Sequence, residues 1–100
     1  MTDELKQLIQ DAARFLGLEV VDWFGDNPTA VDGEGMLSSF NPANPERGDL
    51  MKVVEAADIV VGGGSVYSDY QTLFYIRDDY QSLVLAVLRA ASAMLKARGE

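Results

Sequence analysis

The stretch "ADIVVGGGSVYSDYQTLFYI", from Ala57 to Ile76, decides how this chain is interpreted. It sets an apolar run against three consecutive glycines, then a cluster of Tyr, Ser and Asp, and then a second apolar run. β-Branched and aromatic residues on both sides of a glycine-rich centre are typical of two strands joined by a turn. We therefore expect strands over 59–64 and 70–76, with "GSVYSD" as the connecting turn.

The three glycines do not match a phosphate-binding loop. A P-loop requires a Lys followed by Ser or Thr, and "GGGSVYSDY" contains no Lys. The dinucleotide fingerprint G-x-G-x-x-G fails as well, because Val66 and Tyr67 occupy positions where a third glycine and a helix start are needed. Because we expect a strand to follow the glycines, the anion site of a helix N-terminus is also missing. A hairpin or a bulge explains the glycines more simply.

The N-terminal half of the chain is predicted to form one helix and two strands. Apolar residues at helical spacing predict a helix within "TDELKQLIQDAARFLG", with Thr2 as its N-cap and Gly17 as its stop. Short runs rich in β-branched and aromatic residues predict strands at 18–24 and 36–40. A long segment of turn-forming residues separates these strands, so we expect an antiparallel hairpin with a long tip.

The C-terminal half begins with a proline-rich turn and ends with a long helix. A second helix is expected to start between Asn44 and Asp49. The final segment, "RDDYQSLVLAVLRAASAMLKARGE", has helical spacing and carries Asp78 three residues before Gln81, a spacing typical of a helix cap.

These elements predict a single α+β domain over residues 1–100. Their order is α-β-β-α-β-β-α, and successive strands on short connections favour antiparallel pairing. We therefore expect a mainly antiparallel four-stranded sheet layered with helices. Within the last helix, "LVLAVL" at 83–88 is apolar on nearly every side, wider than one core-facing stripe requires. Either helices and sheet cover it within one chain, or a partner chain does, which would make a homodimer through this helix.

Composition restricts the chemistry that the protein can perform. The chain has 100 residues, no Cys and no His, which removes thiol nucleophiles, zinc ligands of those types and imidazole bases. Its formal net charge of −8 argues against binding to nucleic acid, because phosphate neutralisation needs clustered Lys and Arg. We expect a cytoplasmic protein that does not contact membranes. The acidic surface provides solubility, or it meets a basic protein face or imitates nucleic acid.

A ligand site is predicted around the glycines. Bare backbone N–H groups allow close approach of a ligand, neighbouring polar side chains offer hydrogen bonds, and aromatic rings can stack on a base. Trp23 is either such a ring or part of the core, and Arg77 could meet a phosphate. The predicted ligand-binding residues are Trp23, Gly63, Gly64, Ser65, Tyr67, Asp69 and Arg77. If the prediction is right, these residues converge on one pocket.

No catalytic group, metal site or cofactor is predicted. Ser65 and Ser68 have no His to activate them, and Lys52 and Lys96 lie on predicted helices as surface charges. The acidic residues of the turn at 25–35 do not match the spacing of a calcium loop, so a solvated loop is the simpler explanation. We therefore expect a protein that is not an enzyme, with a carboxylate-only hydrolase as the remaining catalytic alternative.

Two segments of the chain resemble a known family. "FNPANPERGDLMKVVEA" at 40–56 and "YQTLFYIRDDYQSLVLAVLRAASAML" at 70–95 are similar to the small bacteriophage proteins of the phage ABA sandwich domain family. The resemblance implies an α/β/α layered domain encoded by a phage or prophage, acting in the host cytoplasm, with no catalytic residues to transfer. Small phage proteins often block a host defence protein or sequester a nucleotide signal.

The residues and the resemblance together favour a non-catalytic binding protein. Its expected partner is a nucleotide-like small molecule, whose sequestration would counteract host defence, or a host protein. The alternatives are an acidic protein–protein interaction module, acting as an inhibitor or nucleic-acid mimic, and a structural homodimer.

Overall fold

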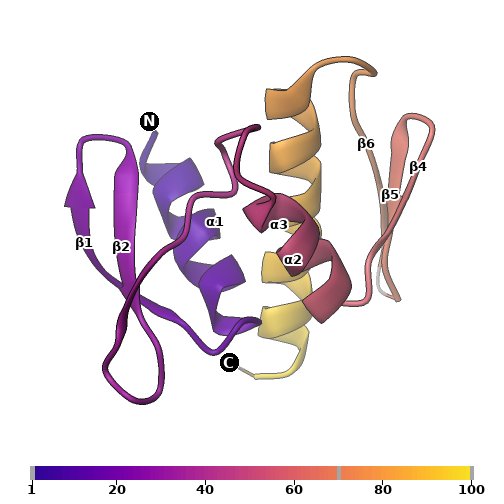
Figure 1. Ribbon diagram of the computed structural model, residues 1–100. Helices are drawn as coiled ribbons and strands as arrows, with labels where there is room; N and C mark the ends of the chain where they lie inside the picture. The colour runs from indigo at the N-terminus through magenta and orange to yellow at the C-terminus, as the bar shows by residue number, and fades with distance from the viewer. Residues whose placement is uncertain (1, 70, 100) are drawn as a thin grey trace.

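The computed structural model describes residues 2–69 and 71–99, and it contains helices and strands in the order shown in Figure 1. The three helices are α1 (Asp3–Arg14), α2 (Asp49–Ala56) and α3 (Tyr80–Ala97). The strands are β1 (Glu19–Phe24), β2 (Asn27–Val31), β3 (Leu37–Ser39), β4 (Val60–Gly62), β5 (Ser65–Tyr67) and β6 (Thr72–Phe74). The α+β class predicted from the sequence is therefore confirmed.

The strands form two separate sheets instead of the one four-stranded sheet that we expected. β1, β2 and β3 make the first antiparallel sheet, and β4, β5 and β6 make the second. The helices lie between the two sheets, with α1 beside the first sheet and α3 beside the second (Figure 1). The layer order is therefore sheet, helices, sheet, which differs from the α/β/α order that the family resemblance implies.

Each sheet contains a central strand that was predicted to be a turn. β2 follows β1 after a two-residue turn whose Gly25 has a φ of +60°, and β5 follows β4 in the same way through Gly63 and Gly64. Pro28 is tolerated in β2 because β3 pairs only with Thr29 and the two residues after it, so no third strand needs the missing Pro28 N–H. Residues that were predicted to form turns thus lie in strands, because β2 and β5 each pair with a neighbouring strand on both sides.

The helix boundaries agree with their predicted caps except at α3. Thr2 Oγ1 accepts a hydrogen bond from the Leu5 backbone N–H at 3.2 Å, which confirms the expected N-cap of α1. At α3 the N-cap is Asp79, whose Oδ1 accepts a hydrogen bond from the Ser82 N–H at 3.3 Å. Asp78 instead takes a left-handed conformation with a φ of +63°, so the predicted cap lies one residue too early.

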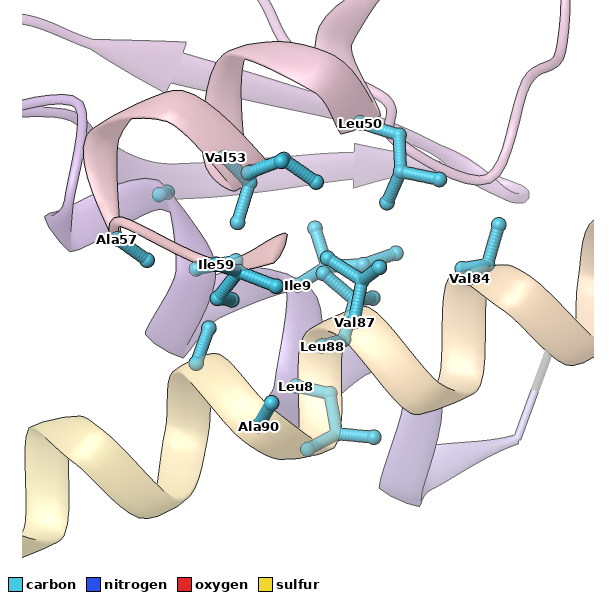
Figure 2. Packing of buried hydrophobic residues seen from close by; sticks show 14 of the residues in the cluster. Leu8, Ile9, Leu50, Val53, Ala57, Ile59, Val84, Val87, Leu88 and Ala90 are labelled. Atoms are coloured by element: carbon cyan, nitrogen blue, oxygen red, sulfur yellow. The ribbon is translucent and has the colours of Figure 1, made fainter. Parts of the chain in front are cut away.

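The core lies where the three helices meet. Leu50 and Val53 of α2 point toward Val84 and Val87 of α3, and Ile9 of α1 closes the space from a third side (Figure 2). Each of these aliphatic side chains contributes about 1.5–3 kcal/mol when it is fully buried. Within the segment 83–88, Leu83 and Leu85 are partly buried and the other four residues are buried, with α1, α2 and the second sheet packed against α3.

Candidate functional site

The glycine turn is a packed hairpin turn. Arg77 Nη2 donates a hydrogen bond to the Gly63 carbonyl oxygen at 3.0 Å, and the Tyr75 hydroxyl donates to the Gly62 carbonyl oxygen at 2.8 Å. A Cβ on Gly63 would lie 2.8 Å from Arg77 Nη2, and Gly64 has a φ of +89°. The close approach of Arg77 therefore explains Gly63, and the positive φ of the turn explains Gly64.

The predicted ligand-binding residues do not converge on one pocket. Gly63, Gly64 and Arg77 lie together at the tip of the second sheet, with Ser65 beside them at the start of β5 and Tyr67 at the other end of that strand. Asp69 is exposed beyond the other end of β5, and Trp23 lies on β1 in the first sheet. The helices separate the two sheets, so the expected stacking of one ligand between Trp23 and Tyr67 is wrong (Figure 1).

Trp23 has a structural role that the sequence left open. Its ring is partly buried against the core, and the Lys6 ammonium lies 5.1 Å from the ring centroid. The core interpretation of Trp23 is therefore the one that the structure supports.

A polar pocket lies at the N-terminal ends of α1 and α3. It has a volume of about 350 Å³ and brings together four segments of the chain: α1, the β1–β2 turn, the connection from β3 to α2, and α3. Its lining residues are Leu5, Asp26, Asn41, Ala43, Asn44 and Gln81. Loops and element ends that meet at one concave site are a common arrangement for ligand binding.

Hydrogen bonds hold the connection at 41–47 in one conformation. The Tyr80 hydroxyl donates to the Pro42 carbonyl oxygen at 2.8 Å, and Gln81 Nε2 donates to the Ala43 carbonyl oxygen at 3.1 Å. Asn41 Oδ1 accepts from the Ala43 N–H at 3.2 Å, which closes a turn of the connection on itself. The pocket wall formed by this connection is thus fixed before any ligand arrives.

Asp49, at the start of α2, holds the connection at 41–47 through contacts with Asn41 and Arg47. Its carboxylate accepts hydrogen bonds from the Asn41 N–H at 2.9 Å and from Arg47 Nε at 2.7 Å, and Lys52 Nζ lies 3.4 Å away. Burial raises the pKa of Asp49, but the Asn41 N–H, followed by the Arg47 guanidinium, outweighs burial, so the pKa lies below its ordinary value. Asp49 is therefore a buried anion that positions Asn41.

The negative charge of Asp49 also affects the pKa of Tyr80. Burial of its ring raises the pKa of the Tyr80 hydroxyl, and the negative charge of Asp49 raises that pKa further. The hydroxyl therefore stays protonated and remains a donor to the connection at ordinary pH.

The amide side chains of the pocket keep unused hydrogen-bonding groups. Asn44 Oδ1 accepts from the Glu46 N–H at 2.9 Å, but within 2–69 and 71–99 the Asn44 Nδ2 group has no acceptor. The Gln81 side chain uses Nε2, while its Oε1 has no donor in the same part of the chain. Together they offer a donor and an acceptor beside the apolar side chain of Leu5.

A second groove, between α1 and α3, is crossed by hydrogen bonds that join the two helices. Its volume is about 390 Å³. Arg89 forms two hydrogen bonds to Glu4 Oε1, the shorter at 2.8 Å, and the buried Ser92 hydroxyl donates to Asp11 Oδ2 at 2.8 Å. These contacts join the two helices, so the groove is better explained by helix packing than by ligand binding.

Asp32, one of the acidic residues considered for metal binding, has a structural role. Asp32 Oδ1 accepts from the Glu34 and Met36 N–H groups, at 2.8 and 3.0 Å, and so closes the loop before β3. Among the residues that the structure describes, no group of three or more Asp or Glu side chains could hold a metal ion. Within residues 2–69 and 71–99, no helix is long and apolar enough to cross a membrane.

Sequence reasoning missed the polar pocket because its residues look like turn formers. Asn41 and Asn44 each precede a proline, and the repeated Asn-Pro pair was interpreted as a helix entry alone. Comparisons with family models, with curated proteins and with solved structures found no match for this chain.

Proposed function

We propose that the protein is a non-catalytic binding protein that holds a small, uncharged, hydrogen-bonding ligand in the polar pocket. The observation that carries this proposal is the convergence of four chain segments on one pocket whose amide groups retain hydrogen-bonding capacity. The contacts of Asp49 and Tyr80 support it, because they fix the pocket wall in advance and so lower the entropic cost of binding.

The chemistry of the lining favours a nucleobase or nucleoside over a nucleotide. Asn and Gln side chains pair with the donor and acceptor edges of planar bases, and Leu5 and Ala43 offer apolar contact to a ring. The lining includes the acidic Asp26 and no Lys or Arg among the described residues, so a phosphate would find no counter-charge there. Of the nucleotide-like ligand that the sequence predicts, we therefore expect the pocket to bind the base or nucleoside part, without the phosphate.

The size of the pocket agrees with such a ligand. A volume of about 350 Å³ lies near the lower end of the range for small-molecule sites, about 300–1,000 Å³. The phage-type role, in which the protein sequesters a signal and counteracts a host defence, stays a prediction.

Isothermal titration calorimetry with adenosine, guanosine, cytidine and uridine, and with their 5′-monophosphates, tests the proposal. We expect binding heat from at least one nucleoside and weaker binding of its monophosphate. Asn44→Ala and Gln81→Ala should each weaken the binding by about tenfold or more, because each removes a hydrogen bond to the base.

Gln7→Ala is the matched control, since Gln7 is an exposed glutamine on α1 that lies outside the polar pocket. This variant should bind like the unmodified protein. If no nucleoside gives heat, or if Asn44→Ala and Gln7→Ala bind equally well, the proposed function is wrong.

A further inference from the structure

A second candidate cavity lies at the connection from β6 to α3, on residues that do not line the polar pocket (Figure 1). It has a volume of about 310 Å³, near the lower end of the range for small-molecule sites. We call it the tyrosine cavity, and its lining residues are Tyr75, Asp78, Asp79, Tyr80 and Leu83. Two aromatic side chains, one aliphatic side chain and two carboxylates therefore meet at one concave site.

Hydrogen bonds to the backbone hold the two tyrosines of this cavity in place. The Tyr75 hydroxyl donates to the Gly62 carbonyl oxygen at 2.8 Å, and the Tyr80 hydroxyl donates to the Pro42 carbonyl oxygen at 2.8 Å. Both side chains are partly buried against the core. Because each O–H group is already used, the tyrosines provide the cavity with ring surface instead of free O–H donors.

The connection that carries the two carboxylates is also held by hydrogen bonds. The Ser82 hydroxyl oxygen accepts from the Ile76 N–H at 2.8 Å, and Asp79 Oδ1 accepts from the Ser82 N–H at 3.3 Å. The Asp79 N–H donates to the Ile76 carbonyl oxygen at 3.2 Å, which closes the turn between them. The tyrosine cavity is therefore formed before a ligand arrives, and this lowers the entropic cost of binding.

The chain itself does not neutralise the negative charge of the tyrosine cavity. In the described part of the chain, the Asp78 carboxylate has no hydrogen bond or ion pair, and Asp79 uses only Oδ1. Arg77 precedes these residues, but it does not line the cavity, and its Nη2 donates to the Gly63 carbonyl oxygen at 3.0 Å. Of the residues that the structure describes, no Lys or Arg lines the cavity. A positively charged ligand would therefore meet two carboxylates without a competing cation in the lining.

We propose that the tyrosine cavity binds a small organic cation that carries a methylated ammonium group. The face of a tyrosine ring carries partial negative charge and attracts a cation that lies within about 6 Å of its centre. The two tyrosines and Leu83 provide apolar contact for the methyl groups, while Asp78 and Asp79 provide the opposite charge. The cavity therefore combines the two features that recognise a quaternary ammonium ion.

Other classes of ligand lack one of these two matches. An anion would be repelled by the two carboxylates, and an uncharged ligand would take them out of water without replacing their lost hydration. Among the described residues, no group of three or more Asp or Glu side chains could hold a metal ion, so two carboxylates beside aromatic rings favour an organic cation over an inorganic one.

This site is independent of the ligand proposed for the polar pocket. The two cavities share no lining residue, so either proposal can fail while the other holds. The substitutions used below leave Tyr80 unchanged, because its hydroxyl also holds the connection at 41–47.

Titration of the isotope-labelled protein with choline chloride, followed by the NMR resonances of its backbone amides, tests the proposal. We expect the resonances of residues 75–83 to shift and to saturate, whereas sodium chloride at the same concentrations should not reproduce these shifts. The neutral alcohol in which carbon replaces the charged nitrogen of choline should bind about tenfold more weakly or less, because it keeps the shape and loses the charge. Absence of saturable shifts in this segment, or equal binding of the neutral alcohol, would overturn the proposal.

Substitutions test the role of the lining residues. Asp78→Asn should raise the dissociation constant of choline by about threefold or more, because it removes a charge and keeps the shape of the side chain. Asp58→Asn is the matched control, since Asp58 is also an exposed aspartate with a positive φ, +56° against +63° for Asp78, but lies outside the cavity. Equal dissociation constants for these two variants would contradict the assigned site.

Tyr75→Leu removes a ring and keeps an apolar side chain. It should weaken the binding of choline by about threefold or more, with a smaller effect on the neutral alcohol, because only the cation is attracted by the ring face. Circular dichroism checks that the variant is folded, and the comparison of Asp78→Asn with Asp58→Asn decides the question if it is not. A folded Tyr75→Leu variant that binds choline like the unmodified protein would show that the ring takes no part.

Discussion

Asp49 is the residue on which the local structure around the polar pocket depends. It is only 3% exposed, yet it carries a charge that one backbone N–H and two cationic side chains stabilise. Burying a carboxylate is costly unless such partners are present. The partners therefore explain both the burial of Asp49 and the fixed position of Asn41.

We predict that Asp49→Asn lowers the free energy of unfolding at neutral pH by about 1–3 kcal/mol. Because the pKa of Asp49 is lowered in the fold, its contribution is complete above the ordinary value of 3.8 and disappears as the pH falls through the folded pKa. The difference between the two proteins should therefore shrink below pH 3.8. Urea unfolding at a series of pH values measures it, with Glu55→Gln on the exposed side of α2 as the control.

A difference that stays constant down to the most acidic pH would show that Asp49 acts by packing alone. The prediction concerns stability, and it holds whether or not the polar pocket binds a ligand.

At the level of single residues, the sequence revealed little of the candidate site. Asn44 and Gln81 are 37 positions apart, and no periodicity links a turn residue to the first turn of a helix. They meet because the connection at 41–47 folds back over the start of α3, where Tyr80 and Gln81 bind its carbonyl oxygens. Hydrogen bonds between distant segments are decided by the fold, so local patterns do not predict them.

Helix α3 shows how one residue sets the start of an element. Asp79→Ala should lower the free energy of unfolding by about 0.5–2 kcal/mol, because it removes the acceptor for the Ser82 N–H. Asp78→Gly should leave stability unchanged or raise it by up to about 1 kcal/mol, since glycine adopts the positive φ of this position without strain. Thermal unfolding of both variants measures these effects. If Asp78→Gly is the more damaging change, the cap that we assign is wrong.

The helices were predictable as elements, whereas two of the strands were not. α1 has a capping residue, a periodic apolar stripe and a terminal glycine, and all three of these local signals predict a helix. β2 contains Asn and Pro, and β5 lies between glycines and the polar pair Ser68 and Asp69, so each resembles a turn when taken alone. Pairing with neighbours on both sides makes them strands, and this is tertiary information.

For the whole molecule, the helices between the sheets make one cooperative core. The first sheet packs on α1, the second packs on α3, and α1 packs on α3, so loss of the helical layer removes support from both sheets. We predict one urea transition with the same midpoint for Trp23 fluorescence, which reports on the first sheet, and for amide resonances of β5 at the same protein concentration. Two separate midpoints would show that the sheets unfold independently.

The separation of the two sheets also explains why one combined site was expected wrongly. Rings in two predicted strands can face each other only if the strands share a sheet or adjoining layers. Here the helical layer stands between Trp23 and Tyr67, and only the assembled topology reveals it (Figure 1).

The position of α3 in the chain has a consequence for protein synthesis. This helix is made after the other elements that the structure describes, and it supplies the surface against which α1, α2 and the second sheet pack. Until it has left the ribosome, the apolar sides of Ile9 and Leu50 lack their covering, and the nascent chain exposes them to chaperones and proteases. A stop codon before residue 80 should therefore yield a polypeptide that is degraded instead of a smaller folded domain.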